Sequence, residues 1–330
     1  MPQTPDAVAP DPILQVATGF MAAKHLFTAS AIDLFAAIGE GEATLAELAE
    51  RTGVPARTLR VSADAMAALG FVEKSGERYR NSPVAAAFLA GRTPADLRPF
   101  LKFWDRISYP TWMGLEAAVR GQGSQEERPF TPEEAKLFNE GVAAVTAGSA
   151  HALAGAVDWS RHTRVLDLGG GTGSFLVALI GAHPHLRGTL FDLPRAIAVA
   201  REHLSGSAGD KIELVEGDFF DREIPAGHDA VLLANVVHGF SEERNLELLR
   251  RVRRAVAPGA ALLIVDFWLD ASRTQPVFPA LMAGEFLIMT GGGESYSDEQ
   301  ARRWLAETGW AARELKPLAG PAGVLTAEAV

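Results

Sequence analysis

The amino-acid sequence predicts an α/β fold, in which a mostly parallel sheet with helices on both faces follows a mainly helical domain. Two patterns in the 330 residues lead to this prediction. From Ile13 through Leu48, apolar residues recur at helical spacing with almost no strand-like alternation. From Arg164 onward, apolar strand candidates alternate with helical segments, and this order is typical of a parallel sheet.

Composition favours a soluble enzyme of small molecules. Hydrophobic residues make up 48% of the chain and charged residues 22%, and no apolar run approaches the roughly 20 residues that cross a bilayer. The net charge of −10 is spread along the chain, which argues against a nucleic-acid partner. The absence of cysteine excludes disulfides, thiolate metal sites and a cysteine nucleophile, and it suits a cytoplasmic location.

Four segments are expected along the chain. The acidic, proline-rich MPQTPDAVAPDP is not a signal peptide and is expected to be a disordered lead-in. The polar stretch GQGSQEERPFTP, rich in helix breakers, is the clearest linker. The predicted boundaries are 1–12 for the lead-in, 13–120 for the helical domain, 121–158 for a linker and connecting helix, and 159–330 for the sheet domain.

The segment Thr44 to Ser82 has the order of a winged helix. Thr44 and Glu47 form a capping-box pair at the start of one helix, and Gly53 ends it. A second helix is expected over 56–69, followed by a hairpin that turns at Ser75-Gly76.

A winged helix raises the possibility of DNA binding. Its second helix offers Arg57 and Arg60 as cations, and Asp64 opposes them. Dimerisation or packing is therefore favoured over the reading of a DNA sequence. The apolar surface of ILQVATGFMAAKHLFTASAIDLFAAI, large for one solvent-facing domain, also predicts a symmetric homodimer.

In the second half, five strand candidates alternate with helices before a terminal pair of strands. The strand candidates are RVLDLG, GTLFDLP, IELVEGDFF, DAVLLANVV and ALLIVDFWL, followed by 311–318 and 323–330. Helices are expected over 173–182, 194–204, 241–256 and 298–308.

The glycine-rich turn after the first of these strands, VLDLGGGTGSF, is expected to contact a ligand, because ligands of open α/β sheets bind beyond the carboxyl ends of the strands. No Gly-Lys-Ser/Thr follows the glycines, which removes the main support for nucleoside triphosphate binding. The dinucleotide fingerprint also fits poorly, since its third glycine falls at Ser174 or Leu176. Asp167, ahead of the glycines, would repel a pyrophosphate but favour an ammonium or sulfonium group. This chemistry points to S-adenosylmethionine.

Two more acidic residues follow the next strands. Asp192 lies at the end of TLFDLP, where a carboxylate can accept both ribose hydroxyls. Asp218 lies in EGDFF beside Phe219, which is placed to contact the adenine. A glycine-rich turn alone is often just a tight connection, and an aspartate at a strand end is often a helix cap. The glycine turn, Asp192 and Asp218, in register across three consecutive strand–helix units, together favour the cofactor.

These motifs together resemble the small-molecule O-methyltransferases of the caffeate and acetylserotonin type, which include bacterial enzymes that tailor polyketides and other secondary metabolites, antibiotics among them. DLGGGTG, FDLP, GDFF and NVVHGFSEE occur in the family's order and spacing, and the resemblance covers nearly the whole chain. It implies a Rossmann-like class I methyltransferase domain, an N-terminal dimerisation domain, and S-adenosylmethionine converted to S-adenosylhomocysteine. The family's donor-binding positions correspond here to Asp167, Gly169, Gly171, Asp192, Asp218 and Phe219.

Transfer of a methyl group to a hydroxyl requires a base that removes the hydroxyl proton, and His238 lies just past the fourth strand of the sheet. The family's catalytic histidine occupies this place, usually before Asp-Trp, whereas Gly239 and Phe240 follow here. The resemblance also assigns Asp266 and Glu294 to the acidic positions that flank the histidine. One carboxylate is expected to hold the imidazole and the other to orient the substrate.

Aromatic and thioether side chains are expected to line the acceptor pocket, and they suit an apolar, planar small molecule. Each could equally be ordinary core. These residues are Phe103, Trp104, Trp112, Phe138, Met282, Phe286 and Met289. His183 and His185 have a spacing that suits a metal, but they fall at the opposite end of the sheet from the glycine turn, and no metal is expected.

Two other functions remain open at this point. The same fold could methylate carbon or nitrogen, or carry out non-methylating chemistry. Alternatively, the chain could be a winged-helix regulator whose sheet domain senses a ligand.

Overall fold

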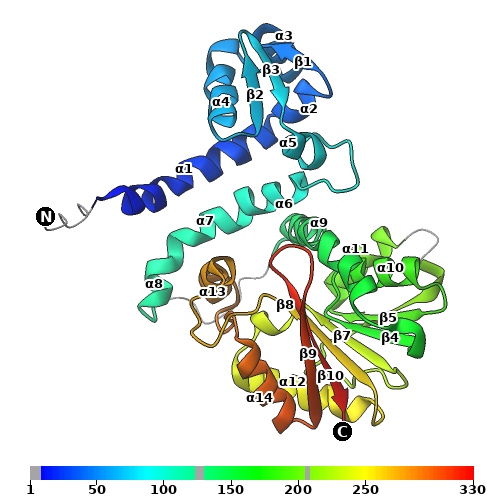
Figure 1. Cartoon of the computed structure of the whole chain (residues 1–330). Coiled ribbons are helices and arrows are strands. Elements are labelled where there is room, and N and C mark those ends of the chain that lie inside the picture. The colour runs from blue at the N-terminus through cyan, green and yellow to red at the C-terminus, as the bar shows by residue number, and fades with distance from the viewer. Residues whose placement is uncertain (1–8, 123–129, 205–208) are drawn as a thin grey trace, which may run out of the picture. The chain divides into compact units, whose positions relative to one another are not determined.

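The structure, a computed structural model, describes residues 9–122, 130–204 and 209–330. It divides into two compact units, Met1–Arg106 and Ile107–Val330, both drawn in Figure 1. The division falls before the expected boundary at residue 120. The reason is that the segment after Ile107 packs on a helix of the second unit. Most of the predicted linker lies outside the described residues.

The first unit contains the predicted winged helix. Its elements are α1 (Asp11–Ala31), α2 (Leu34–Ile38), β1 (Glu42–Thr44), α3 (Leu45–Thr52), α4 (Ala56–Ala68), β2 (Val72–Ser75), β3 (Arg78–Asn81), α5 (Pro83–Phe88) and α6 (Arg98–Phe103). The three strands form an antiparallel sheet in the order β1-β3-β2. The capping box is present, since Thr44 Oγ1 accepts from Glu47 N and the Glu47 carboxylate accepts from Thr44 N. Helix α1 starts within the expected lead-in, because Pro12 is well tolerated in a first helical turn.

The charges of the winged helix are engaged with each other. Asp64 on α4 accepts hydrogen bonds from Lys74 Nζ at 2.6 Å and from Tyr79 Oη at 2.8 Å. Arg60 lies 3.8 Å from the other oxygen of Asp64. The carboxylate thus offsets cations that a DNA-binding helix would direct at phosphates.

The second unit is built on one large sheet. Seven of the described strands pair in the order β6-β5-β4-β7-β8-β10-β9. They are β4 (Arg164–Leu168), β5 (Arg187–Asp192), β6 (Ile212–Glu216), β7 (Ala230–Ala234), β8 (Ala261–Asp266), β9 (Trp310–Pro317) and β10 (Gly323–Ala329). The pairs among β4 to β8 are parallel, whereas β10 is antiparallel to both β8 and β9. All seven predicted strands are confirmed.

Helices cover both faces of this sheet, as Figure 1 shows. On one face lie α9 (Pro132–Ala156), α10 (Ser174–Ala182) and α11 (Pro194–His203), which bury Leu153, Phe175 and Ile197 in one apolar cluster. On the other lie α12 (Glu242–Ala255) and α14 (Asp298–Glu307), which bury Leu248 and Trp304 in a second cluster. Removal of these side chains from water on both faces stabilises the sheet domain.

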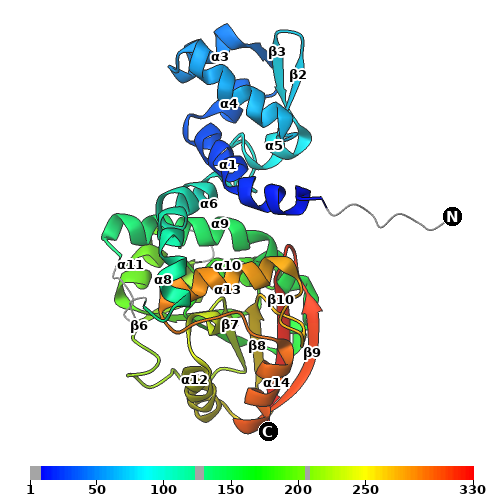
Figure 2. The ribbon, with the colours of Figure 1, turned by 90° about the vertical axis from the view of Figure 1, so that its left-hand side faces the viewer.

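A further helix, α13 (Val277–Thr290), lies beside the start of the second unit. It packs on the short helices η2 (Trp112–Gly114) and α8 (Leu115–Val119), which follow η1 (Trp104–Ser108) and α7 (Tyr109–Thr111). Figure 2 shows α8 and α13 together. Gly284 permits the approach, because a Cβ atom there would lie 3.0 Å from Trp112 Cη2.

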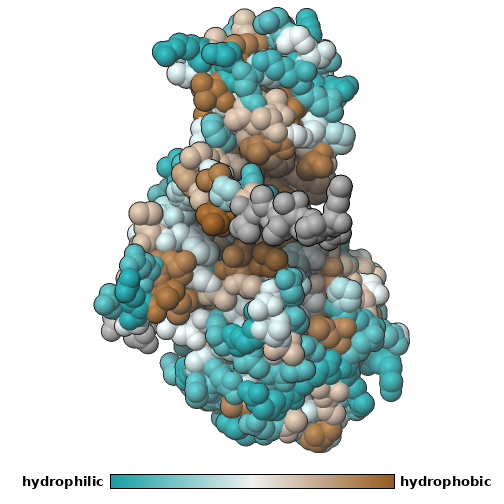
Figure 3. All heavy atoms as spheres, turned by 60° about the vertical axis from the view of Figure 1, so that its left-hand side comes forward, coloured by the Kyte–Doolittle hydropathy of each residue, from teal (hydrophilic) through white to brown (hydrophobic). Residues whose placement is uncertain are grey.

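Apolar side chains are exposed on α1 of the first unit. Figure 3 shows hydrophobic areas, in brown, interrupting the teal surface of this N-terminal unit. The exposed side chains of α1, each more than half accessible, are Ile13, Leu14, Val16, Phe20 and Met21. Among the described residues, no helix combines the length and apolarity that crossing a membrane requires.

Candidate active site

Parallel strands bring three carboxyl groups to one edge of the sheet. Asp167 lies near the end of β4, while Asp192 and Asp266 are the last residues of β5 and β8. The Asp192 carboxylate accepts hydrogen bonds from Gly171 N at 2.8 Å and from Leu193 N at 2.7 Å. The second carboxylate therefore holds the glycine turn that follows the first strand.

The glycine turn passes directly over the Asp167 side chain. Gly169, Gly171 and Gly173 have φ values of 72°, 58° and 77°, which are left-handed conformations that favour glycine. Gly170 has no such φ, yet a Cβ atom there would lie 2.3 Å from Asp167 Oδ2. The predicted site omitted Gly170, although it is the member of the turn with the least room for a side chain among these four. Within a run of identical residues, the sequence carried no signal to single it out.

The Asp167 carboxyl is fully buried, and neither of its oxygens has a hydrogen-bond partner. Burial, together with the nearby charge of Asp192, raises its pKa to about 8. Burial also raises the pKa of Asp192, against the two backbone N–H groups that favour its charged form. Because the charge of Asp192 disfavours a charge on Asp167, a cationic ligand between the turn and these carboxyls would be stabilised.

Phe219 lies next to the glycine turn. Its Cε1 would be 3.6 Å from a Cβ atom at Gly169, and its ring meets Phe240 edge-on at 5.8 Å between centroids. Asp218, two residues beyond β6, accepts a hydrogen bond from Phe220 N at 2.8 Å. Asp218 thus shapes the turn that presents Phe219.

Asn139, on α9, also reaches the glycine turn. Its Oδ1 would lie 3.3 Å from a Cβ atom at Gly171, while its Nδ2 donates to Ala135 O at 2.7 Å. The contact depends on how α9 packs, which one residue type cannot reveal.

His238 and Asp266 form a hydrogen-bonded pair. His238 Nδ1 lies 2.8 Å from Asp266 Oδ1, and the Asp266 side chain is only 2% exposed. The imidazole stacks on Phe286 with 3.9 Å between ring centroids and 9° between planes. With Nδ1 engaged and 16% of the side chain exposed, the Nε2 edge is the part of the ring left to meet a ligand.

The loop that carries His238 is fixed by hydrogen bonds from Asn245 on α12. Asn245 Nδ2 donates to Val237 O at 2.9 Å and to Phe240 O at 3.1 Å. A Cβ atom at Gly239 would have no atom within 4 Å, so this departure from the family pattern leaves open space beside the histidine.

Glu294 lies in the loop beside His238 but is directed elsewhere. Gly293 is so close that a Cβ atom there would lie 2.0 Å from His238 O. The Glu294 carboxylate pairs with Arg273 at 3.0 Å, and within the described residues it has no hydrogen bond to His238. Of the two acidic residues expected to flank the histidine, only Asp266 contacts the imidazole by a hydrogen bond. The Arg273 charge explains the orientation of the other.

Comparison with known families decides the assignment. An O-methyltransferase domain matches residues 116–311, and an O-methyltransferase dimerisation domain matches residues 14–91. The chain belongs to the O-methyltransferase family.

Individual relatives resemble this O-methyltransferase along nearly its whole length. The tetracenomycin polyketide synthesis 8-O-methyl transferase TcmO of Streptomyces glaucescens is 33% identical, over 94% of each chain. The N,N-dimethyltransferase OxyT of Streptomyces rimosus is 31% identical, over 92% of this chain and 91% of its own. The structure of human N-acetylserotonin methyltransferase in complex with S-adenosylmethionine superposes with a TM-score of 0.90 at 25% identity, over 100% of this chain and 99% of that one.

The O-methyltransferase uses S-adenosylmethionine as methyl donor. Its own residues fit that ligand, because the turn between Gly169 and Gly173 carries a single side chain and is backed by two carboxyls. Asp167 is completely buried beneath this turn.

The residues expected around the acceptor fall into two groups. One group lies on or against α13: the helix carries Met282, Phe286 and Met289, and Trp112 packs against it. In the same unit, Phe138 on α9 packs on Phe130 with 5.4 Å between ring centroids. Phe103 and Trp104 belong instead to the first compact unit, where Phe103 is buried and Trp104 packs on Phe100 at 4.6 Å.

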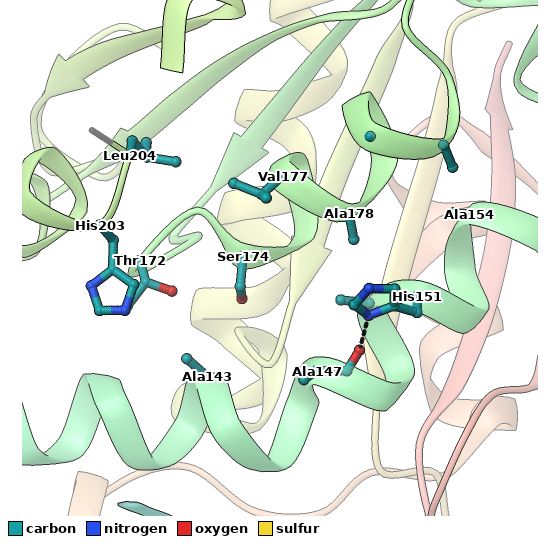
Figure 4. Close-up of a pocket in the computed structure, with 13 residues that line it drawn as sticks. Ala143, Ala147, His151, Ala154, Thr172, Ser174, Val177, Ala178, His203 and Leu204 are labelled. Carbon is teal, nitrogen blue, oxygen red and sulfur yellow. Dashed lines mark hydrogen bonds between the residues drawn. The ribbon is translucent and has the colours of Figure 1, made fainter. Parts of the chain in front are cut away.

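A separate hollow of about 410 Å³ lies between α9 and α10. Figure 4 shows Ala143 and Ala147 of α9 on one side and Ser174 and Val177 on the other. None of the acidic residues described above lines it, nor does His238. His183 and His185 do not line it and bond to backbone carbonyls. The described part of the chain has no cluster of side chains suited to a metal.

Proposed function

We propose that this O-methyltransferase methylates a hydroxyl group of an aromatic or polyketide-like small molecule, with His238 as the general base. The hydrogen bond of 2.8 Å between His238 Nδ1 and Asp266 Oδ1 supports the proposal most strongly. A carboxylate at Nδ1 holds the tautomer whose Nε2 is free to accept a proton, and it stabilises the imidazolium that results. The acceptor hydroxyl loses its proton to Nε2 as its oxygen becomes the nucleophile.

Bound S-adenosylmethionine supplies an electrophilic methyl group on its sulfonium. The chain's part is to align the acceptor oxygen with that methyl group and to exclude water. In this proposal Asp192 binds the ribose, Phe219 contacts the adenine, and the turn from Gly169 to Gly171 receives the amino-acid end, with Asp218 maintaining the shape of the site.

The acceptor is proposed to bind against α13. Phe286 covers one face of the imidazole, and Met282, Met289 and Trp112 add apolar surface that suits a planar ring system. The Glu294 carboxylate is proposed to orient the acceptor by binding the acceptor's polar groups. Phe103, Trp104 and Phe138 remain predicted contacts.

A panel of paired acceptors tests the reaction class. After incubation with labelled donor, planar phenols such as naphthols and hydroxyanthraquinones are expected to be labelled at least about tenfold faster than the matching arylamines. The reason is that a positioned base accelerates attack by a hydroxyl, which must lose its proton, and gives no such advantage to a neutral amine. The measurement is label transferred per minute with each compound. Preferred transfer to the amines would instead support N-methylation, which the relative OxyT makes the second candidate.

We also propose a homodimer formed through the N-terminal unit, in the cytoplasm. The dimerisation domain matches residues 14–91, and the exposed apolar side chains of α1 fall largely within it. Light scattering coupled to size exclusion is expected to give about twice the chain mass of 35.1 kDa. Phe20→Glu with Met21→Glu is expected to shift the protein toward monomer, and a monomeric native protein would contradict the proposal.

A further inference from the structure

The hydroxyl of Tyr296 is bonded to the loop that carries the proposed base. Tyr296 Oη donates to Phe240 O at 2.6 Å, two residues after His238. The same carbonyl accepts the hydrogen bond from Asn245 on α12. Tyr296 is only 3% exposed, and it belongs to the loop that carries Glu294.

The backbone of Tyr296 holds a third segment. Leu269 N, three residues beyond Asp266, donates to Tyr296 O at 3.0 Å. Glu294 precedes Tyr296 by two residues. Tyr296 therefore joins the segment of the base to those of both acidic residues expected beside it.

Tyr296 is itself firmly placed. Its ring meets Trp304 of α14 edge-on, with 4.6 Å between centroids, and Trp304 is fully buried. The next residue, Ser297, begins α14 with a capping box that it shares with Gln300. Burial raises the pKa of the Tyr296 phenol, and the charge of Glu294 acts in the same direction, so the hydroxyl keeps its proton and stays a donor at neutral pH.

The loop lacks a local constraint directly after the base. Gly239 has more backbone freedom than a residue with a side chain, and a Cβ atom there would meet nothing within 4 Å. This position therefore adds neither stiffness nor packing next to His238. Hydrogen bonds to the following carbonyl, Phe240 O, supply the constraint instead.

Resting on the proposed function, we infer that Tyr296 is a positioning residue, whose hydroxyl fixes the loop so that the His238 imidazole meets Asp266 and directs Nε2 at the acceptor hydroxyl. No contact of Tyr296 with the donor or the acceptor is part of this role. A general base must lie within about 2.6–3.2 Å of the oxygen whose proton it removes. A small displacement of the loop therefore lowers the rate of transfer more than it lowers binding.

Tyr296→Phe tests the inference, because it removes the hydroxyl and keeps the ring that packs on Trp304. With a phenol as acceptor, kcat is expected to fall at least about fivefold, while KM for the acceptor and the calorimetric affinity for S-adenosylmethionine stay within about twofold. A smaller fall in kcat would overturn the inference. Equal losses in kcat and in donor affinity would also overturn it, because they indicate general loosening of the sheet domain.

Tyr79→Phe is the matched control. Tyr79 is 2% exposed, and its Oη donates to Asp64 Oδ1 at 2.8 Å within the winged helix, so this variant also loses one hydroxyl from a buried ring. It is expected to leave kcat unchanged. An equal fall in both variants would show that the loss of any buried tyrosine hydroxyl slows the enzyme, and the role of Tyr296 would then be refuted.

NMR of the imidazole proton distinguishes this inference from the proposed reaction. The proton that His238 Nδ1 donates to Asp266 gives a far-downfield resonance, identified by its loss in His238→Ala. Tyr296→Phe is expected to shift or broaden this resonance, and Tyr79→Phe to leave it unchanged. If no phenol is methylated but the resonance responds in this way, the positioning role stands and hydroxyl methylation fails. If phenols are methylated through His238 but neither kcat nor the resonance responds to Tyr296→Phe, the reaction stands and the role of Tyr296 fails.

Discussion

Replacement of His238 by alanine is expected to lower the rate of methyl transfer to a phenol by about 10²–10⁴-fold, the usual contribution of a general base. The reason is that the acceptor hydroxyl then loses the group that takes its proton. Binding of S-adenosylmethionine should change little, because its proposed contacts come from the strand ends and the glycine turn. Single-turnover rates and calorimetric affinities, measured on the same preparation, separate the two effects.

His151→Ala provides the matched control, since His151 is an exposed histidine whose Nδ1 bonds to Ala147 O on its own helix. Asp266→Asn should also slow transfer, because an amide does not stabilise the imidazolium and can favour the wrong tautomer. Transfer by His238→Ala at a near-normal rate would rule out the proposed base and leave methylation of a group that needs none.

Replacement of Asp167 by asparagine is expected to have opposite effects on the ligand-free protein and on donor binding. At pH 8 the ligand-free variant should be more stable than the native protein, because an amide avoids the cost of a buried charge. Its affinity for S-adenosylmethionine should fall by roughly 10- to 100-fold, since the carboxylate beneath the turn no longer attracts the ligand's positive charge.

The pH dependence follows from the raised pKa of Asp167, about 8 in the folded protein against 3.8 as its ordinary value. The folded chain holds this proton more tightly than the unfolded chain. The stability gained from the proton is therefore complete below about pH 4 and is lost as the pH rises toward 8. At roughly 1.4 kcal/mol per pKa unit, the native protein loses several kcal/mol over this range through Asp167.

Denaturant unfolding at a series of pH values provides the measurement. The free energies of unfolding of Asp167→Asn and the native protein should be similar near pH 4 and diverge toward pH 8, with the variant more stable. A variant that is less stable at every pH would show that the native carboxylate is charged and favourably bonded in the ligand-free protein.

Much of the arrangement at the carboxyl edge of the sheet was predictable from the sequence. Parallel strands end at one edge, so acidic residues that follow successive strands must gather there, as Asp167, Asp192 and Asp266 do. The short distance from β7 to His238 likewise limits the histidine to the same edge. The strands themselves were predictable because buried parallel strands are continuous apolar runs.

The acceptor side was less predictable, because it depends on packing between distant segments. Glu285 stands in an apolar helix, and nothing in the local pattern shows that Ser108, 177 positions earlier, packs against it. The pairing of Glu294 with Arg273 likewise depends on the path of the loop between them. The complete enclosure of Asp167 follows from how the glycine turn folds back, which a sequence motif does not reveal.

If the proposed acceptor site is correct, the concentration of its residues on α13 has a consequence for how such an enzyme diversifies. Met282, Phe286 and Met289 all lie within 14 residues of one helix outside the sheet. The proposed donor contacts and the His238–Asp266 pair lie instead at the strand ends and in the loops that follow them. Substitutions within this single helix would then redirect the enzyme to new acceptors while the residues that handle the methyl group are inherited unchanged.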